Sequence, residues 1–144
     1  MAHQLFPIVN LLALVGWLLL AVLPGRRWTT ELVSGWLIPG VLAAVYVAII
    51  AATWGRSPGG FSSLEAVAQL FDNAWLLLAG WVHYLAFDLF VGSWVVRDSR
   101  QRGIAHAWIL PILFVTFMFG PAGWLSYLAL RTILRRLDVG QGVG

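Results

Sequence analysis

The chain has 144 residues, of which 60% are hydrophobic and 10% are charged, whereas roughly a quarter of an ordinary soluble domain is charged. A core of this size cannot bury so much apolar surface, so the composition excludes a soluble globular protein and indicates a protein of the lipid bilayer. Cysteine is absent, which excludes disulfides, thiolate metal sites and a cysteine nucleophile. The net charge of +3 suits anionic lipid headgroups, and it excludes nucleic acid as a partner because a nucleic-acid site needs a denser basic face.

Four long stretches with almost no charge predict four membrane-spanning helices. We place these spans at residues 5–23, 36–54, 74–96 and 107–130. At about 1.5 Å per residue each span can cross a hydrocarbon core of roughly 30 Å, and none alternates as barrel strands do. The expected fold is therefore all-α: an integral membrane four-helix bundle, a single domain over residues 1–144 with a flexible tail at 138–144.

A short helix is predicted between spans two and three. A turn-rich break at residues 57–60 is followed by Ser62 and, three residues later, Glu65, which is the spacing of a capping box. The next apolar residues share one helical face: Leu64, Val67 and Phe71. We expect a short interfacial helix along the membrane surface, although an ordinary solvated turn of helix fits the pattern equally well.

The arginines do not orient the four predicted spans. An even number of spans puts both termini on one side of the membrane. The first and third loops then carry Arg26, Arg27, Arg97, Arg100 and Arg102, against Arg56, Arg131, Arg135 and Arg136 on the other side. Because the two sides carry five and four arginines, the positive-inside rule does not decide the orientation of the chain in the membrane.

Two ionisable residues, His83 and Asp88, lie within span three, where such groups are costly and often functional. Five residues separate them by about 7.5 Å along a helix and about 140° around it, so they do not form an intrahelical pair. Asp88 is expected to be protonated or paired with an arginine from a span end, Arg97 or Arg131. The alternative is a purely structural role as polar glue between helices.

The face of span three that carries Asp88 is expected to point into the bundle. Its members follow one another at spacings of three, four and four residues: Trp81, Tyr84, Asp88 and Gly92. No carboxylate lies at a metal-ligand spacing from His83, so we expect no metal site, although a lone histidine could still ligate the magnesium of a chlorophyll.

Residues 120–123, Gly-Pro-Ala-Gly, interrupt span four. A proline inside a helix removes one backbone hydrogen bond and kinks the helix, and the flanking glycines allow a close approach. The segment predicts either a groove for a flat ligand or a simple packing kink between small residues.

Two motifs carry a resemblance to a known family. They are residues 81–90, Trp-Val-His-Tyr-Leu-Ala-Phe-Asp-Leu-Phe, with Asp98 ten residues after Asp88, and residues 119–123, Phe-Gly-Pro-Ala-Gly. They resemble the abscisic-acid-deficient-four family, small four-helix membrane proteins of plastids with bacterial relatives, whose plant members are associated with forming neoxanthin from violaxanthin. The resemblance implies a bacterial relative in an inner membrane, cytoplasmic or photosynthetic.

The resemblance implies a carotenoid-binding or carotenoid-modifying protein that needs no cofactor and isomerises a xanthophyll epoxide to an allene. Such a step needs an acid and a base, for which we expect Asp88 and His83, with Tyr84 orienting Asp88. The expected ligand-binding residues are Trp81, Gly92, Phe119, Gly120, Pro121 and Gly123.

A non-catalytic role remains open. Small size and abundant aromatic residues also fit an accessory subunit of a larger membrane complex, for example a photosynthetic one. Such a subunit would bind carotenoid, chlorophyll or lipid, and a small homo-oligomer is a further arrangement that the sequence allows.

Overall fold

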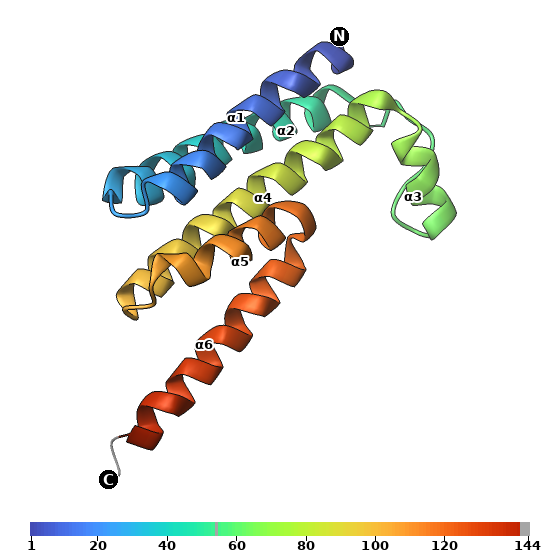
Figure 1. The fold of residues 1–144 in the computed structure, drawn as a ribbon. Helices are drawn as coiled ribbons and strands as arrows, with labels where there is room; N and C mark the ends of the chain where they lie inside the picture. The colour runs from blue at the N-terminus through green and yellow to red at the C-terminus, as the bar shows by residue number, and fades with distance from the viewer. Residues whose placement is uncertain (54, 142–144) are drawn as a thin grey trace.

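The computed structural model describes residues 1–53 and 55–141, with side chains up to residue 135, and in these ranges the chain forms only helices and loops. The helices are α1 (Ala2–Val22), η1 (Trp28–Leu37), α2 (Ile38–Thr53), α3 (Leu64–Phe71), α4 (Ala74–Gln101), α5 (His106–Phe119) and α6 (Pro121–Gln141). Figure 1 shows α1, α2, α4 and α5 packed along one another, with α3 at one end and α6 diverging from the bundle. The core lies around α4, which contacts every other helix.

Three helical stretches are long and apolar enough to cross a membrane: Ala2–Val22, Trp28–Thr53 and Ala74–Gln101. They agree with the first three predicted spans. The second begins earlier than predicted because η1, a π-helix, runs directly into α2, and its predicted end at residue 54 lies outside the described residues. The third continues past residue 96 because its polar last turn is still helical.

The predicted fourth span is not one continuous helix. α5 has 14 residues, about 21 Å of helix, which is too short to cross the hydrocarbon core. Gly120 ends it with a φ of +34°, and Pro121 has no N–H to continue the hydrogen-bond ladder. α6 then runs back along α5, so close that a β-carbon on Gly123 would collide with Thr116. We therefore correct the expectation of four spans to three long spans and a helical hairpin.

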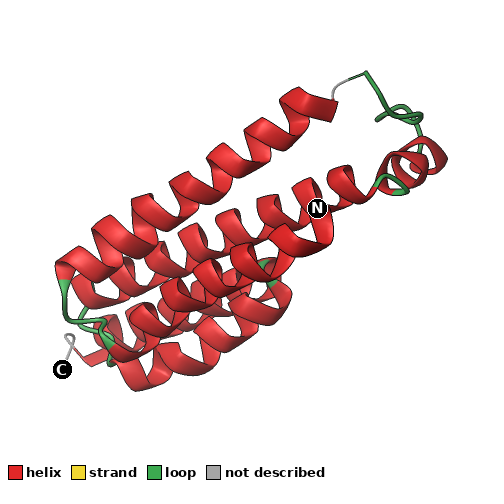
Figure 2. Cartoon of the chain, turned by 90° about the horizontal axis from the view of Figure 1, so that it is seen from above, coloured by secondary structure: helices red, strands yellow, loops and turns green. Residues whose placement is uncertain are grey.

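The hairpin places the two ends of the described chain at opposite ends of the bundle. The N-terminus lies near α3, whereas α6 runs toward the end that holds the α1–η1 and α4–α5 loops (Figures 1 and 2). This arrangement differs from the expectation that both termini lie on the same side of the membrane, which follows from four spans. This basic end carries Arg26, Arg27, Arg97, Arg100, Arg102, Arg131 and Arg135, whereas Arg56 lies at the α3 end.

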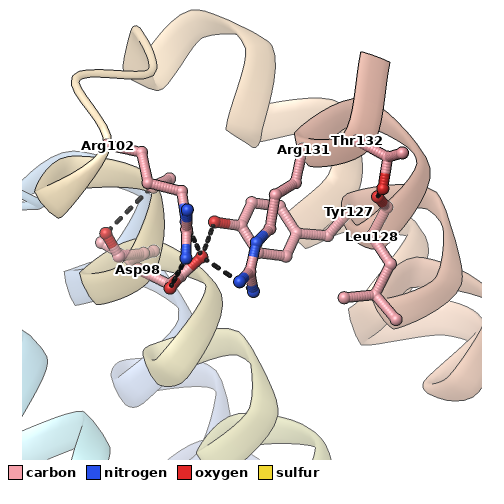
Figure 3. A network of polar contacts seen from close by, with 8 residues as sticks. Asp98, Arg102, Tyr127, Leu128, Arg131 and Thr132 are labelled. Carbon is pink, nitrogen blue, oxygen red and sulfur yellow. Dashed lines mark hydrogen bonds and ion pairs between the residues drawn. The ribbon is translucent and has the colours of Figure 1, made fainter. Parts of the chain in front are cut away.

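A polar network holds the start of α6 against α4 (Figure 3). The hydroxyl of Tyr127 donates to Oδ2 of Asp98 at 2.5 Å, and Nε of Arg102 donates to the same oxygen at 2.7 Å. Arg131 adds an ion pair at 3.5 Å. The ring of Tyr127, which is fully buried, also meets Trp94 edge to face at 5.6 Å. Asp98 therefore joins two helices that are far apart in the sequence.

The short helix between the second and third spans is present as α3. Its N-cap is Ser63, whose hydroxyl oxygen accepts the N–H of Ala66 at 3.2 Å. The predicted cap at Ser62 is thus one residue too early, because the first helical turn begins at Leu64. α3 packs against the start of α4, where the ring of Phe71 lies over Gly80.

Candidate functional site

Asp88 lies halfway along α4, against the tip of the α5–α6 hairpin. A β-carbon added to Gly120 would fall 2.5 Å from Oδ1 and 2.9 Å from Oδ2 of Asp88. Oδ2 is buried and accepts no hydrogen bond from the described residues. Because an unpaired buried carboxylate is costly, this oxygen is available to a partner that the described residues do not supply. Neither arginine expected beside Asp88 forms an ion pair with it: Arg131 pairs with Asp98, and Arg97 lies beside Gly35.

Tyr84 lies one turn before Asp88 on the same face of α4. Its hydroxyl donates to the carbonyl of Phe117 at 2.9 Å. That carbonyl belongs to the last turn of α5, where carbonyls have no partner within their own helix. Tyr84 therefore fixes the end of α5, and with it the position of Gly120, beside Asp88.

An apolar groove of about 620 Å³ begins at Tyr84 and runs toward the α3 end of the bundle. Its walls come from α1, α3 and α4: Ala2, His3, Phe6, Phe71, Ala74, Leu77, Leu78, Gly80, Trp81 and Tyr84. The groove exists because α5 ends at Phe119 and covers only the second half of α4 (Figure 1). The hairpin thus leaves a hollow beside the first half of α4, with Asp88 one turn beyond its inner end.

Trp81 forms part of the groove wall and is fixed there by α1. Its indole N–H donates to Oδ1 of Asn10 at 3.1 Å, and Asn10 in turn donates to the carbonyl of Phe6 at 2.7 Å. The rings of Phe6 and Tyr84 lie 5.8 Å and 5.3 Å from that of Trp81. These contacts hold an aromatic surface open to the groove.

Gly92, predicted to bind a ligand, is covered by another side chain. The ring of Trp17 lies where a β-carbon on Gly92 would stand, and it meets Phe117 edge to face at 5.6 Å. Trp17 is buried. The space beside Gly92 is therefore filled by the protein, and the available part of the predicted face extends from Trp81 to Asp88.

His83 is not brought together with Asp88. Its side chain is exposed on another face of α4, where the ring stacks on Phe87 at 4.6 Å and lies 5.6 Å from Tyr46. The angular separation that the helical period predicts is thus what the structure shows. His83 faces the surroundings of the bundle, and in the described part of the chain no three His, Asp or Glu side chains gather to hold a metal ion.

The remaining predicted ligand residues lie at the hairpin tip. Phe119 and Pro121 are exposed, whereas Gly120 and Gly123 are buried. Gly120 contacts the Asp88 carboxylate, while Gly123 serves the crossing of α6 over α5.

Sequence reasoning missed Trp17 and the groove wall on α1 and α3. A lone Asn10 in an uncharged span predicts a hydrogen bond to a neighbouring helix, with His83 or Asp88 as the expected partner, whereas the structure pairs Asn10 with Trp81. Nothing in the sequence connects Trp17 to Gly92.

The comparisons with known proteins give one result. Residues 4–127 match the model of the ABA4-like family, described as ABA DEFICIENT 4-like. No match is found among curated proteins or among solved structures. The matched range includes Asp88, the hairpin tip, Tyr127 and the groove wall apart from Ala2 and His3. The chain therefore belongs to the ABA4-like family of membrane proteins.

Proposed function

We propose that this protein binds a carotenoid in the groove between α1, α3 and α4 and rearranges the end group of that carotenoid at Asp88. The observation that carries the proposal is the buried, unpartnered oxygen of Asp88, one turn beyond the end of an apolar groove. Ionisable groups in membrane helices are costly and mark functional sites by default. The family supports the ligand class, because it is associated with neoxanthin synthesis in plants.

The groove suits one end of a long apolar molecule. Its volume of about 620 Å³ lies within the roughly 300–1,000 Å³ of small-molecule sites. Phe6, Phe71 and Trp81 provide aromatic surface for a conjugated chain. Because the groove lies on the outside of membrane-spanning helices, a ligand dissolved in the bilayer can enter sideways and leave its other end in lipid.

The proposed reaction is an isomerisation of an epoxide to an allene. Protonation of the epoxide oxygen breaks a C–O bond, and loss of a proton from the neighbouring chain carbon forms the allene, while the epoxide oxygen becomes a hydroxyl. One proton is consumed and one is released, so a single carboxyl group can donate the first and accept the second. Since His83 lies on another face, we assign both steps to Asp88, with Tyr84 positioning the hairpin tip.

The test supplies membranes containing an epoxy-xanthophyll and follows the allenic isomer by chromatography. Asp88→Asn is expected to lower the rate by about 10²- to 10⁴-fold, the usual contribution of an acid–base group. The matched control is Asp72→Asn, because Asp72 is an exposed aspartate after α3, outside the groove wall. His83→Ala is expected to keep its activity, and a loss equal to that of Asp88→Asn would return the role of base to His83. An unchanged rate in Asp88→Asn would contradict the mechanism.

The groove is tested separately by filling it. Leu77 lines the groove and is 57% exposed, so Leu77→Trp is expected to reduce the carotenoid that copurifies with the protein without disturbing the core. Leu18→Trp is the control, because Leu18 is 54% exposed on α1 and does not line the groove. Equal carotenoid content in both variants would exclude the groove as the binding site.

A further inference from the structure

A second pocket, separate from the groove, lies at the basic end of the bundle. It has a volume of about 260 Å³ and lies between η1 and the last turns of α4. Its walls are formed by Arg27, Thr30, Glu31, Arg97, Arg100 and Gln101. Three arginines, one just before η1 and two on α4, thus line one hollow. The hollow is roughly large enough for eight water molecules at about 30 Å³ each.

Two of these arginines have no carboxylate partner among the described residues. Glu31 pairs with Arg27 at 3.1 Å. Asp98, the acidic residue of this part of α4, forms ion pairs with Arg102 and Arg131 and accepts a hydrogen bond from Tyr127. Arg97 and Arg100 form no ion pair in the described part of the chain, so the pocket keeps an uncompensated positive charge.

Each of the two unpaired side chains has a contact with the α1–η1 loop or with η1, although Arg100 is exposed. Arg97 is half-buried, and one of its terminal nitrogens lies 2.8 Å from where a β-carbon on Gly35 would stand. Arg100 donates to the carbonyl of Pro24 in the α1–η1 loop. A backbone carbonyl thus holds the guanidinium group of Arg100, and that of Arg97 packs against Gly35. Guanidinium groups held in this way favour the forked hydrogen bonding that arginine gives to phosphate.

The pocket lies at the level expected for lipid headgroups. Trp28 begins η1, Trp108 lies in the first turn of α5, and both side chains are exposed, 53% and 66%. Tryptophans in such positions are typical of the membrane–water interface. The same end holds seven of the eight arginines whose side chains are described, with Arg56 at the other end. By the positive-inside rule this end faces the cytoplasmic leaflet, where anionic lipids provide a negative surface.

We propose that the pocket between η1 and α4 binds the phosphate group of an anionic phospholipid through Arg97 and Arg100. The site is independent of the carotenoid groove, because the two share no lining residue. The ligand is recognised by a phosphate whose negative charge no cation in its own headgroup neutralises, while its acyl chains remain in the bilayer beside η1 and α4.

The experiment measures thermal unfolding of the detergent-purified protein by its tryptophan fluorescence while phosphatidylglycerol or phosphatidylcholine is added. We expect phosphatidylglycerol to raise the unfolding temperature until the effect levels off at high lipid concentration. Phosphatidylcholine is expected to leave the unfolding temperature unchanged. Arg97→Gln and Arg100→Gln should each weaken binding. We expect each to raise the phosphatidylglycerol concentration needed for half of the full stabilisation by about tenfold. Arg135→Gln at the same end and Arg56→Gln at the other end are the controls, with changes within about twofold.

Several outcomes would overturn the proposal. Equal stabilisation by both lipids contradicts the selectivity for an anionic phospholipid, because both lipids carry a phosphate and only phosphatidylglycerol has a net negative headgroup. Equal weakening in Arg135→Gln replaces the pocket with a diffuse basic surface. Inorganic phosphate is added separately at matched ionic strength. If it alone stabilises the protein through Arg97, the phosphate pocket stands and the lipid source is wrong. If Arg97→Gln does not fold, Arg97→Lys keeps the charge without the fork, and binding as tight as in the unmodified protein then contradicts the proposal.

Discussion

The Asp88 carboxylate occupies the space that a side chain at position 120 would need, so Gly120 and Asp88 form one unit. A β-carbon at Gly120 would lie 2.5 Å from Oδ1, and the backbone there has a φ of +34°. Both conditions require glycine: one through the close approach of a side chain, the other through a conformation that other residues rarely adopt. The turn that reverses the chain into α6 thereby also delivers the hairpin tip to Asp88.

Gly120→Ala is expected to destabilise the protein by roughly 1–3 kcal/mol or more, from backbone strain together with the collision with Asp88. It should also lower carotenoid turnover, because either Asp88 or the hairpin tip must move. Thermal unfolding in detergent and product analysis measure both effects. Gly40→Ala is the control, since Gly40 lies in α2 with nothing within 4 Å of its added β-carbon. A helix-interior Gly→Ala change should be neutral or stabilise by up to about 1 kcal/mol. Equal stability of the two variants would contradict the Gly120–Asp88 contact.

Tyr127→Phe is expected to release the start of α6 from α4. The change removes the hydrogen bond to Asp98, a charge-assisted bond worth about 1.5–3 kcal/mol. Hydrogen exchange should rise in α6 before it rises in α4, because the two remaining contacts of Asp98 come from long arginine side chains. Ser126→Ala is the neighbouring control, since the hydroxyl of Ser126 donates only within α6, to Ala122, and is exposed. Matching exchange in both variants would show that Asp98 does not hold α6.

The start of α3 is expected to respond to pH and to the loss of its cap. The pKa of Glu65 is lowered, because its carboxylate accepts hydrogen bonds from its own backbone N–H and from Ser63. A lowered pKa contributes stability that is present above the ordinary carboxylate value and is lost as the pH falls through the lowered pKa. The protection factors of the α3 amides, which correct for the slower intrinsic exchange in acid, should therefore fall at acidic pH.

Ser63→Ala should raise exchange in α3 already at neutral pH, with a local cost of about 1 kcal/mol. Ser62→Ala provides the comparison, because sequence spacing predicts Ser62 as the cap whereas the structure places the cap at Ser63. If Ser62→Ala has the larger effect, the sequence-based position of the cap is the correct one.

The three long spans could be predicted because an uncharged stretch of sufficient length has few alternatives in lipid. The face of Tyr84 and Asp88, and its separation from His83, could be predicted as well, since both follow from the helical period. The direction of the chain after Gly120 could not, because a kink and a full reversal share the same Gly-Pro signal. After the reversal, α6 is held against α4 by the contact of Tyr127 with Asp98, which are 29 residues apart, and no local pattern encodes that contact.

Single cysteines can decide between a hairpin and a fourth span, because the chain has no cysteine of its own. Gly25→Cys marks the α1–η1 loop, Ser62→Cys the α3 end and Thr132→Cys the middle of α6, and all three positions are exposed. Labelling with a membrane-impermeant maleimide in intact and opened membranes assigns each position to a side. The hairpin predicts that Thr132→Cys is labelled together with Gly25→Cys and opposite to Ser62→Cys. A continuous fourth span predicts that Thr132→Cys is labelled together with Ser62→Cys. That second result would return the arginines of α6 to the α3 end, and it would separate Asp98 from Tyr127.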